Sequence, residues 1–88
     1  MIRANSEAEE KAKRLARLES FLGELCRLRG LSLAELSESL FGDKFKLYNI
    51  TQKGREPNLS TLHVLHKAGL NADWLISGEG EMMRARRG

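Results

Sequence analysis

The sequence has a single cysteine and a single proline, and aromatic residues make up only 6% of its 88 positions. One cysteine, Cys26, can form neither an internal disulfide bond nor a zinc site, which needs about four ligands. No apolar run approaches the ~20 residues of a membrane-spanning helix, and the N-terminus has no apolar stretch of signal-peptide length. We therefore expect a cytoplasmic protein with no membrane association.

The sequence also offers little for catalysis. The two histidines, His63 and His66, are three residues apart without an acidic cluster beside them, so we expect no metal site. We find no pair of carboxylates in a plausible cleft, no glycine-rich phosphate loop and no serine–histidine–aspartate set. The sequence therefore predicts no enzyme and no cofactor, and no small-molecule ligand is evident.

The abundant residues favour helices. Leucine, alanine, glutamate, lysine and arginine dominate, and no hydrophobic stretch alternates with a period of two over a useful length. Apolar residues make up 41% of the chain, enough for one small core, and 88 residues correspond to one domain. The predicted fold is all-α with five helices. Because the net charge is only +3, the local arrangement of charge matters more than its sum.

A long first helix is predicted, which Gly30 ends. Its apolar face is formed by leucines that step by three and four residues: Leu15, Leu18, Leu22 and Leu25. Ser6 and Glu9 have the spacing of a capping box at its start. Residues 1–14 form an extension that is largely charged and projects beyond the core. This extension is either a solvated helix end, or a dimer contact or phosphate-facing arm using Lys11, Lys13, Arg14 and Arg17.

Two short helices joined by a tight turn are predicted between residues 31 and 53. Ser32 and Glu35 have capping-box spacing at the start of the first of them. A turn around Gly42 ends it, and Asp43 can cap the helix that follows. Because so short a turn makes the two helices cross steeply, the pattern is typical of a helix-turn-helix.

The second of these helices, predicted at residues 44–53, can bury either of two faces. At ~100° per residue, Leu47 and Ile50 share one side, whereas Phe45 and Tyr48 share another. If the aliphatic pair points inward, the aromatic and polar side chains that can contact a base pair lie outside. The opposite choice would expose a bare isoleucine, so we favour the first orientation.

The outward side chains of this helix suit contacts with double-stranded DNA. Lysine can donate to guanine, asparagine can form two hydrogen bonds with adenine, and an aromatic ring can pack on the thymine methyl group. We therefore predict base contacts from Lys44, Phe45 and Asn49. Basic side chains, phenols and the start of a helix can bind phosphate. We predict phosphate contacts from Ser32, Lys46, Tyr48, Lys53 and Arg55.

Two further helices complete the prediction. Asn58 or Ser60 caps a fourth helix, with Leu59, Leu62 and Leu65 inward. Asn71 caps a short fifth helix that ends at Gly78. The helix-turn-helix domain therefore spans residues 15–78. Residues 79–88 contain three arginines and are predicted to be a flexible basic tail or the start of a linker.

Two motifs resemble those of a known family. The first is Gly30-Leu31-Ser32-Leu33-Ala34-Glu35-Leu36-Ser37, with Leu40, Leu47 and Ile50 at the family's buried spacings. The second runs from Leu70 to Met82, with the sequence LNADWLISGEGEM. On these motifs the chain from about Leu15 to Met83 resembles the lambdoid-repressor family, also called Cro/repressor-type or xenobiotic-response-element-type DNA-binding domains. The resemblance implies a lambda-repressor-like five-helix fold with an extended first helix, and it selects the inward leucine–isoleucine pair.

The resemblance also implies a function. The chain would be a sequence-specific transcriptional regulator of phage or prophage type that binds a palindromic operator as a homodimer, with helix 44–53 in the major groove. Leu33 departs from the family, in which a phosphate-contacting glutamine is usual, so we expect weaker binding with the same fold. The alternative is a helix-turn-helix used to bind protein, as an antitoxin, anti-repressor or adaptor, because exposed apolar groups can mark a protein interface.

Overall fold

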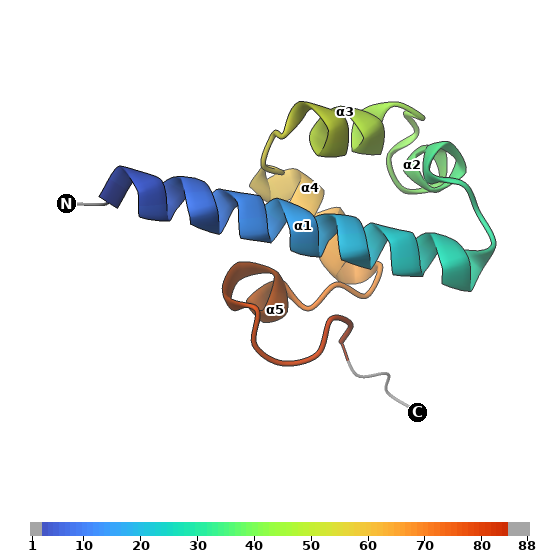
Figure 1. The fold of residues 1–88 in the computed structure, drawn as a ribbon. Helices are drawn as coiled ribbons and strands as arrows, with labels where there is room; N and C mark the ends of the chain where they lie inside the picture. Colours follow the sequence, from blue (N-terminus) through green and yellow to red (C-terminus); the bar gives the residue numbers. More distant parts are fainter. Residues whose placement is uncertain (1–2, 85–88) are drawn as a thin grey trace.

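The structure, a computed structural model, describes residues 3–84 of the chain. It contains the five expected helices: α1 (Arg3–Arg29), α2 (Leu33–Phe41), α3 (Lys46–Lys53), α4 (Leu59–Lys67) and α5 (Ala72–Ser77). Figure 1 shows α1 as the long central helix, with α2 and α3 on one side and α5 on the other. The predicted all-α fold with an extended first helix is confirmed. Among the described residues, none of the helices combines the length and apolar character needed to cross a membrane.

The start of α1 differs from the prediction. The helix begins at Arg3, so Ser6 lies inside it and is not an N-cap. No proline or glycine precedes Ser6, and therefore nothing in the sequence stops the helix from extending upstream. Residues 7–13 are exposed, and Arg14 and Leu15 are the first half-buried residues after them. The extension thus projects from the body over about two turns.

All five helices contribute to one core. Phe21 is fully buried on α1, and the other buried apolar side chains are leucines and one isoleucine. They come from α1 (Leu18, Leu22 and Leu25), α2 (Leu36), α3 (Leu47 and Ile50), α4 (Leu65), α5 (Leu75) and the α4–α5 connection (Leu70). The leucine spacing that predicted α1 therefore marks the face that the other four helices cover.

One of the predicted core leucines is on the surface. Leu59 is 83% exposed, whereas Leu65 on the same helix is fully buried. Asn58 caps α4 by accepting a hydrogen bond from the Thr61 amide, which makes Leu59 the first helical residue. Six residues at ~100° each place Leu59 about 120° away from Leu65 around the helix axis. The prediction for Leu59 is therefore wrong, and Thr61 occupies the buried face in its place.

The C-terminal part of the domain is attached to α1 and α4 by arginines. The Arg17 guanidinium donates to the carbonyl oxygens of Leu75 and Ile76 at 2.8 Å and 3.0 Å, which stabilises the negative end of the α5 dipole. Arg17 is therefore not available as part of a phosphate-facing arm.

Residues 79–84, which were predicted to belong to a flexible tail, are held by hydrogen bonds from Asn71 to Met82 and from Arg84 to Gly69. Residues 85–88 lie outside the described part of the chain.

A buried hydroxyl joins α2 to α3. Ser37 of α2 has no exposed surface, and its Oγ donates to the Asp43 carbonyl at 2.5 Å and accepts from the Leu47 amide at 3.0 Å. Leu47 is the second residue of α3, where backbone N–H groups have no partner within the helix. The N-cap residue, Phe45, supplies no side-chain cap. A side chain of α2 therefore caps α3 and fixes where it begins.

This contact generates a stability prediction. Ser37→Ala leaves the buried Leu47 amide without an acceptor, and we expect the free energy of unfolding to fall by about 1–3 kcal/mol. Ser39→Ala is the matched control, because Ser39 lies on the same helix but is exposed, and we expect a change within about 0.5 kcal/mol. Urea unfolding followed by circular dichroism measures both. Equal effects of the two substitutions would show that the hydroxyl does not cap α3.

Candidate nucleic-acid interface

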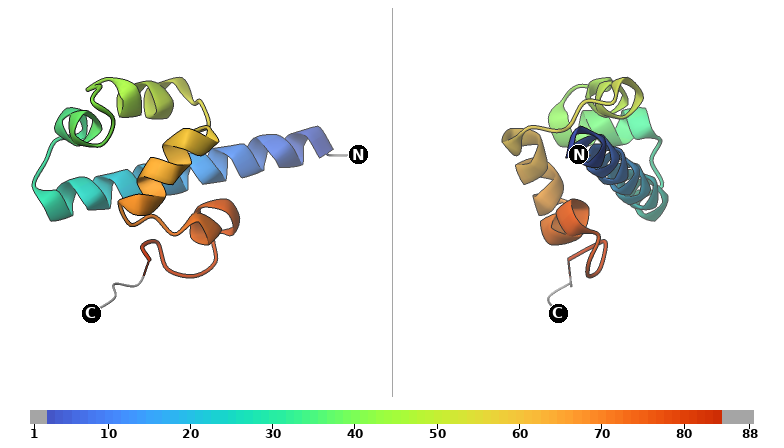
Figure 2. Two further views of the ribbon diagram at one scale, coloured as in Figure 1. Left: turned by 180° about the vertical axis from the view of Figure 1, so that it is seen from behind. Right: turned by 60° about the vertical axis from the view of Figure 1, so that its left-hand side comes forward.

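The orientation of α3 is the one expected from the sequence. Leu47 has no exposed surface and Ile50 is 6% exposed, whereas Phe45 and Tyr48 are 58% and 52% exposed. Figure 2 shows that α3 lies at the edge of the molecule, on the side of α1 opposite α5. The outer face of α3 is therefore uncovered by the rest of the described chain, and it carries the polar and aromatic residues.

The helix begins two residues later than predicted. α3 starts at Lys46 and not at Lys44, because Asp43 organises a separate turn ahead of it. The Asp43 carboxylate accepts a hydrogen bond from the Phe45 amide at 2.9 Å, and its carbonyl accepts one from the Lys46 amide at 3.2 Å. Asp43 therefore caps this turn and not the helix directly. Lys44 and Phe45 are exposed at the tip that leads into α3.

The three predicted base-reading residues lie near the N-terminal half of α3, but their surroundings are partly acidic. Lys44 lines a shallow hollow together with Glu35 and Glu38 of α2. Its Nζ also lies 5.5 Å from the centroid of the Phe45 ring, within cation–π range. The sequence reasoning missed this acidic neighbourhood, although the three-residue spacing of the two glutamates places them on one helix face. They reduce the positive potential around Lys44. Asn49 is exposed on α3 itself.

The predicted phosphate-binding residues fall into two groups. Tyr48, Lys53 and Arg55 are exposed on α3 and the loop that follows it. Lys46 is half-buried, with its Nζ 6.0 Å from the Phe41 ring centroid. Tyr48, Lys53 and Arg55 are therefore accessible to a phosphate without rearrangement. The Lys46 ammonium group would first have to move away from the Phe41 ring.

Ser32 is committed to a capping box. Its hydroxyl accepts from the Glu35 amide at 3.1 Å, and its own amide donates to the Glu35 carboxylate at 2.9 Å. This confirms the predicted capping box, but it places a negative charge at the start of α2. A phosphate could approach the Ser32 amide only if the Glu35 side chain moved away, so the two roles predicted for Ser32 compete.

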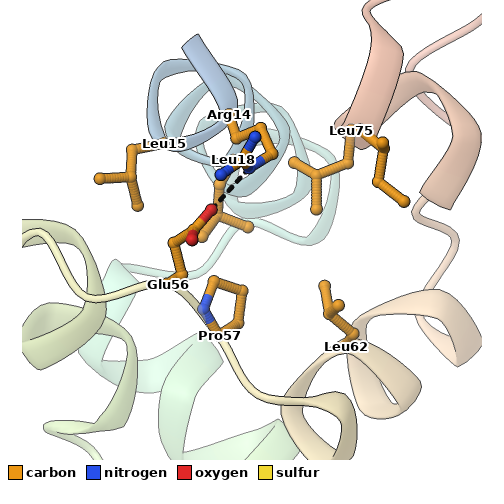
Figure 3. A pocket seen from close by; sticks show the side chains of 8 residues that line it. Arg14, Leu15, Leu18, Glu56, Pro57, Leu62 and Leu75 are labelled. Carbon is orange, nitrogen blue, oxygen red and sulfur yellow. Dashed lines mark hydrogen bonds and ion pairs between the residues drawn. The ribbon is translucent and has the colours of Figure 1, made fainter. Parts of the chain in front are cut away.

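A cavity of about 230 Å³ lies behind the loop that follows α3. Figure 3 shows it between α1, the loop, α4 and α5, with the Arg14–Glu56 ion pair on one side. The rest of its wall is apolar and consists of Leu15, Leu18, Pro57, Leu62, Leu75 and Ile76. Ile76 is 60% exposed, so the cavity opens beside an apolar surface residue.

The remaining candidates are not gathered into a site. His63 and His66 are exposed, and within residues 3–84 no three histidine, cysteine or acidic side chains are grouped so as to hold a metal ion. Cys26 is half-buried against the core, and burial raises the pKa of its thiol. The thiol is therefore held in its protonated and less reactive form.

Comparison with known proteins gives no match. No protein-family model matches the chain, and neither a curated protein nor a solved structure matches it at a significant level. The resemblance to the lambdoid-repressor family therefore depends on the two sequence motifs. The outward face of α3 and the residues around it are the structural features that bear on function.

The exposure of the α3 side chains predicts a clear order of mutational effects. Leu47→Ala removes a fully buried side chain, and we expect it to lower the free energy of unfolding by about 2–5 kcal/mol. Tyr48→Ala, one residue along the same helix, removes an exposed ring and should change it by about 0.5 kcal/mol or less. Thermal and urea unfolding of the two variants measure the difference. A larger loss for Tyr48→Ala would mean that α3 buries its aromatic face.

Proposed function

We propose that this chain is a sequence-specific DNA-binding transcriptional regulator whose α3 enters the major groove. The observation that carries the proposal is the orientation of α3, in which Leu47 and Ile50 are buried while Asn49, Phe45 and Tyr48 face outward. A helix with its side chains is about 10–12 Å in diameter and therefore fits the major groove, which is about 12 Å wide. α2 packs against α3, as the first helix of a helix-turn-helix does.

The distribution of charge supports modest affinity. Tyr48, Lys53 and Arg55 offer phosphate contacts along the exposed edge of α3, whereas Glu35 and Glu38 oppose an approach of phosphate near Lys44. Each phosphate that a lysine or arginine neutralises releases counterions, so affinity falls as salt increases, in proportion to the small number of such contacts. Specificity then depends mainly on the base contacts of Asn49 and on the packing of Phe45 against thymine methyl groups.

The regulator acts as a homodimer in this proposal, and one face suits a second copy. Ile76 lines the cavity and is 60% exposed. Pro57 also lines the cavity, and Leu59, two residues after it in the sequence, is 83% exposed. A two-fold axis brings the same patch of both copies together, so each copy can bury the apolar residues of the other around its cavity. Such a dimer reads a palindromic operator if its two α3 helices are about 34 Å apart.

A protein-binding function is the second candidate, and one observation favours it. Phe45 and Tyr48 are both more than half exposed on the surface proposed to face DNA, and aromatic residues are enriched at protein interfaces. An antitoxin, anti-repressor or adaptor would use these rings as its main contacts. The base-reading amide of Asn49 would then contribute little.

Selection from a pool of duplexes with a random central segment tests the DNA-binding proposal. We expect enrichment of a palindromic sequence whose half-sites are separated by about one helical turn. Asn49→Ala should weaken binding to the selected duplex by about 1–3 kcal/mol if its amide pairs with an adenine. His63→Ala, at an exposed position of α4, is the control and should bind like the unmodified protein. Mobility shifts at low and high salt measure affinity and its salt dependence.

Two outcomes decide between the candidates. If no sequence is enriched and no shift occurs at micromolar protein in low salt, the chain does not act on DNA. If Phe45→Ala abolishes the activity of the protein in the cell while Lys44→Ala and Asn49→Ala leave that activity intact, the surface binds protein.

The proposed dimer face makes a separate prediction. Ile76→Lys should shift the sedimentation equilibrium toward monomer, because it places a charge in an interface that would otherwise be apolar. Leu28→Lys is the control: Leu28 is 56% exposed, but it lies near the far end of α1 from the cavity. A dimer that is unaffected by Ile76→Lys and dissociated by Leu28→Lys would place the interface at the end of α1.

A further inference from the structure

A long-range ion pair connects α1 to the loop between α3 and α4. The Arg14 Nε donates to the Glu56 Oε2 at 2.5 Å across 42 residues of sequence. The two side chains are 31% and 40% exposed, so the pair is partly shielded from solvent. Figure 3 shows it on the side of the cavity where the loop passes over α1.

This loop has few other restraints. At its start, the Arg55 amide donates to the Ile50 carbonyl at 3.1 Å, and at its end Asn58 caps α4. Between these two points, Pro57 has no amide hydrogen to donate. Beside the apolar packing of half-buried Pro57 in the cavity wall, the Glu56 side chain therefore ties the middle of the loop to the body of the domain.

The position of Glu56 also matters for charge. It directly follows Arg55 and lies three residues after Lys53, the two basic residues proposed to contact phosphates at this end of α3. A free carboxylate beside them would repel the same phosphates. The hydrogen bond from Arg14 holds the pKa of the Glu56 carboxyl below its ordinary value, with a smaller contribution from the charge of Lys11. Glu56 is thus an ionised group whose charge is compensated on the α1 side.

We propose that Arg14 is a positioning residue of the DNA-binding surface. It holds Glu56 against α1 and so fixes the loop that carries Arg55. It also directs the Glu56 carboxylate away from the phosphate backbone of the bound DNA. This role depends on the proposed function, because it assigns the loop to phosphate contact. Arg14, at the end of the α1 extension, then acts through Glu56 and not as a phosphate ligand, since its Nε is hydrogen-bonded to the Glu56 carboxylate.

A double-mutant cycle measured on a duplex with a single half-site, where dimerisation does not enter, tests the proposal. Arg14→Ala frees Glu56 beside Arg55, and we expect affinity to fall by about threefold to tenfold, within the range of coupling between contacting residues. Glu56→Gln should bind as well as the unmodified protein or better. In the Glu56→Gln background the loop attachment is still lost but no carboxylate remains to repel phosphate, so Arg14→Ala should lower affinity by less than it does in the native chain.

Lys13→Ala is the matched control. It removes the same charge one residue away on α1, where Lys13 is exposed and lies 3.7 Å from Glu10, but it leaves the loop attachment intact. We expect less than about a twofold loss of affinity from it. If Lys13→Ala weakens binding as much as Arg14→Ala, or if Arg14→Ala is equally harmful in the Glu56→Gln background, Arg14 contributes only charge and the proposal is wrong.

Hydrogen exchange in the absence of DNA separates this proposal from the proposed function. Arg14→Ala should accelerate exchange of the Arg55 amide, because the hydrogen bond to Ile50 then belongs to a less restrained loop. Lys13→Ala should leave that rate unchanged. If the Arg55 amide exchanges at the same rate in both variants, the positioning role fails even if the protein binds DNA. If exchange accelerates and no duplex is bound, the loop attachment is real and the DNA-binding function fails.

Discussion

The hydroxyl group of Ser37 is the contact on which the arrangement of α2 and α3 depends. Two short helices joined by a tight turn have few residues with which to define their relative position. A fully buried oxygen that donates to the turn and accepts from the second residue of α3 fixes three segments at once. Because it sets where α3 begins, it also determines which side chains turn outward. The properties proposed for the outer face of α3 therefore depend on the buried Ser37 hydroxyl, which is not itself part of that face.

The electrostatics of this surface are mixed and not uniformly basic. Glutamates of α2 lie near one end of α3, and the single acidic residue at the other end is compensated from α1. A helix presented in this way gains little from long-range attraction alone. In the proposed complex with DNA, discrimination between sequences would then come mainly from short-range contacts of Asn49 and Phe45. A phosphate-contacting glutamine would have added attraction at the start of α2, where the chain has Leu33.

Much of the fold could be predicted from local signals in the sequence. Helix caps at Ser32, Asn58 and Asn71 and helix ends at Gly30 and Gly78 follow from the preferences of single residues. The inward face of α3 followed from the angular spacing of Leu47 and Ile50. Two of the failures have causes that no local pattern shows, a partner distant in sequence and competition between neighbouring caps. Arg17 was predicted to belong either to a solvated helix end or to a dimer contact or phosphate-facing arm because nothing local revealed α5 beside it, and the turn at Asp43 displaced the start of α3 by two residues.

The hydrogen bonds that hold residues 79–84 have a practical consequence. Arg84 is fixed to the end of α4 through the carbonyl oxygens of His66 and Gly69, and the segment that follows α5 lies on the side of α1 away from α3 (Figures 1 and 2). A fluorophore or a biotin group coupled just after this point would start from an anchored position remote from α3. Immobilising the protein on a sensor chip through that attachment would therefore leave α3 facing the flow.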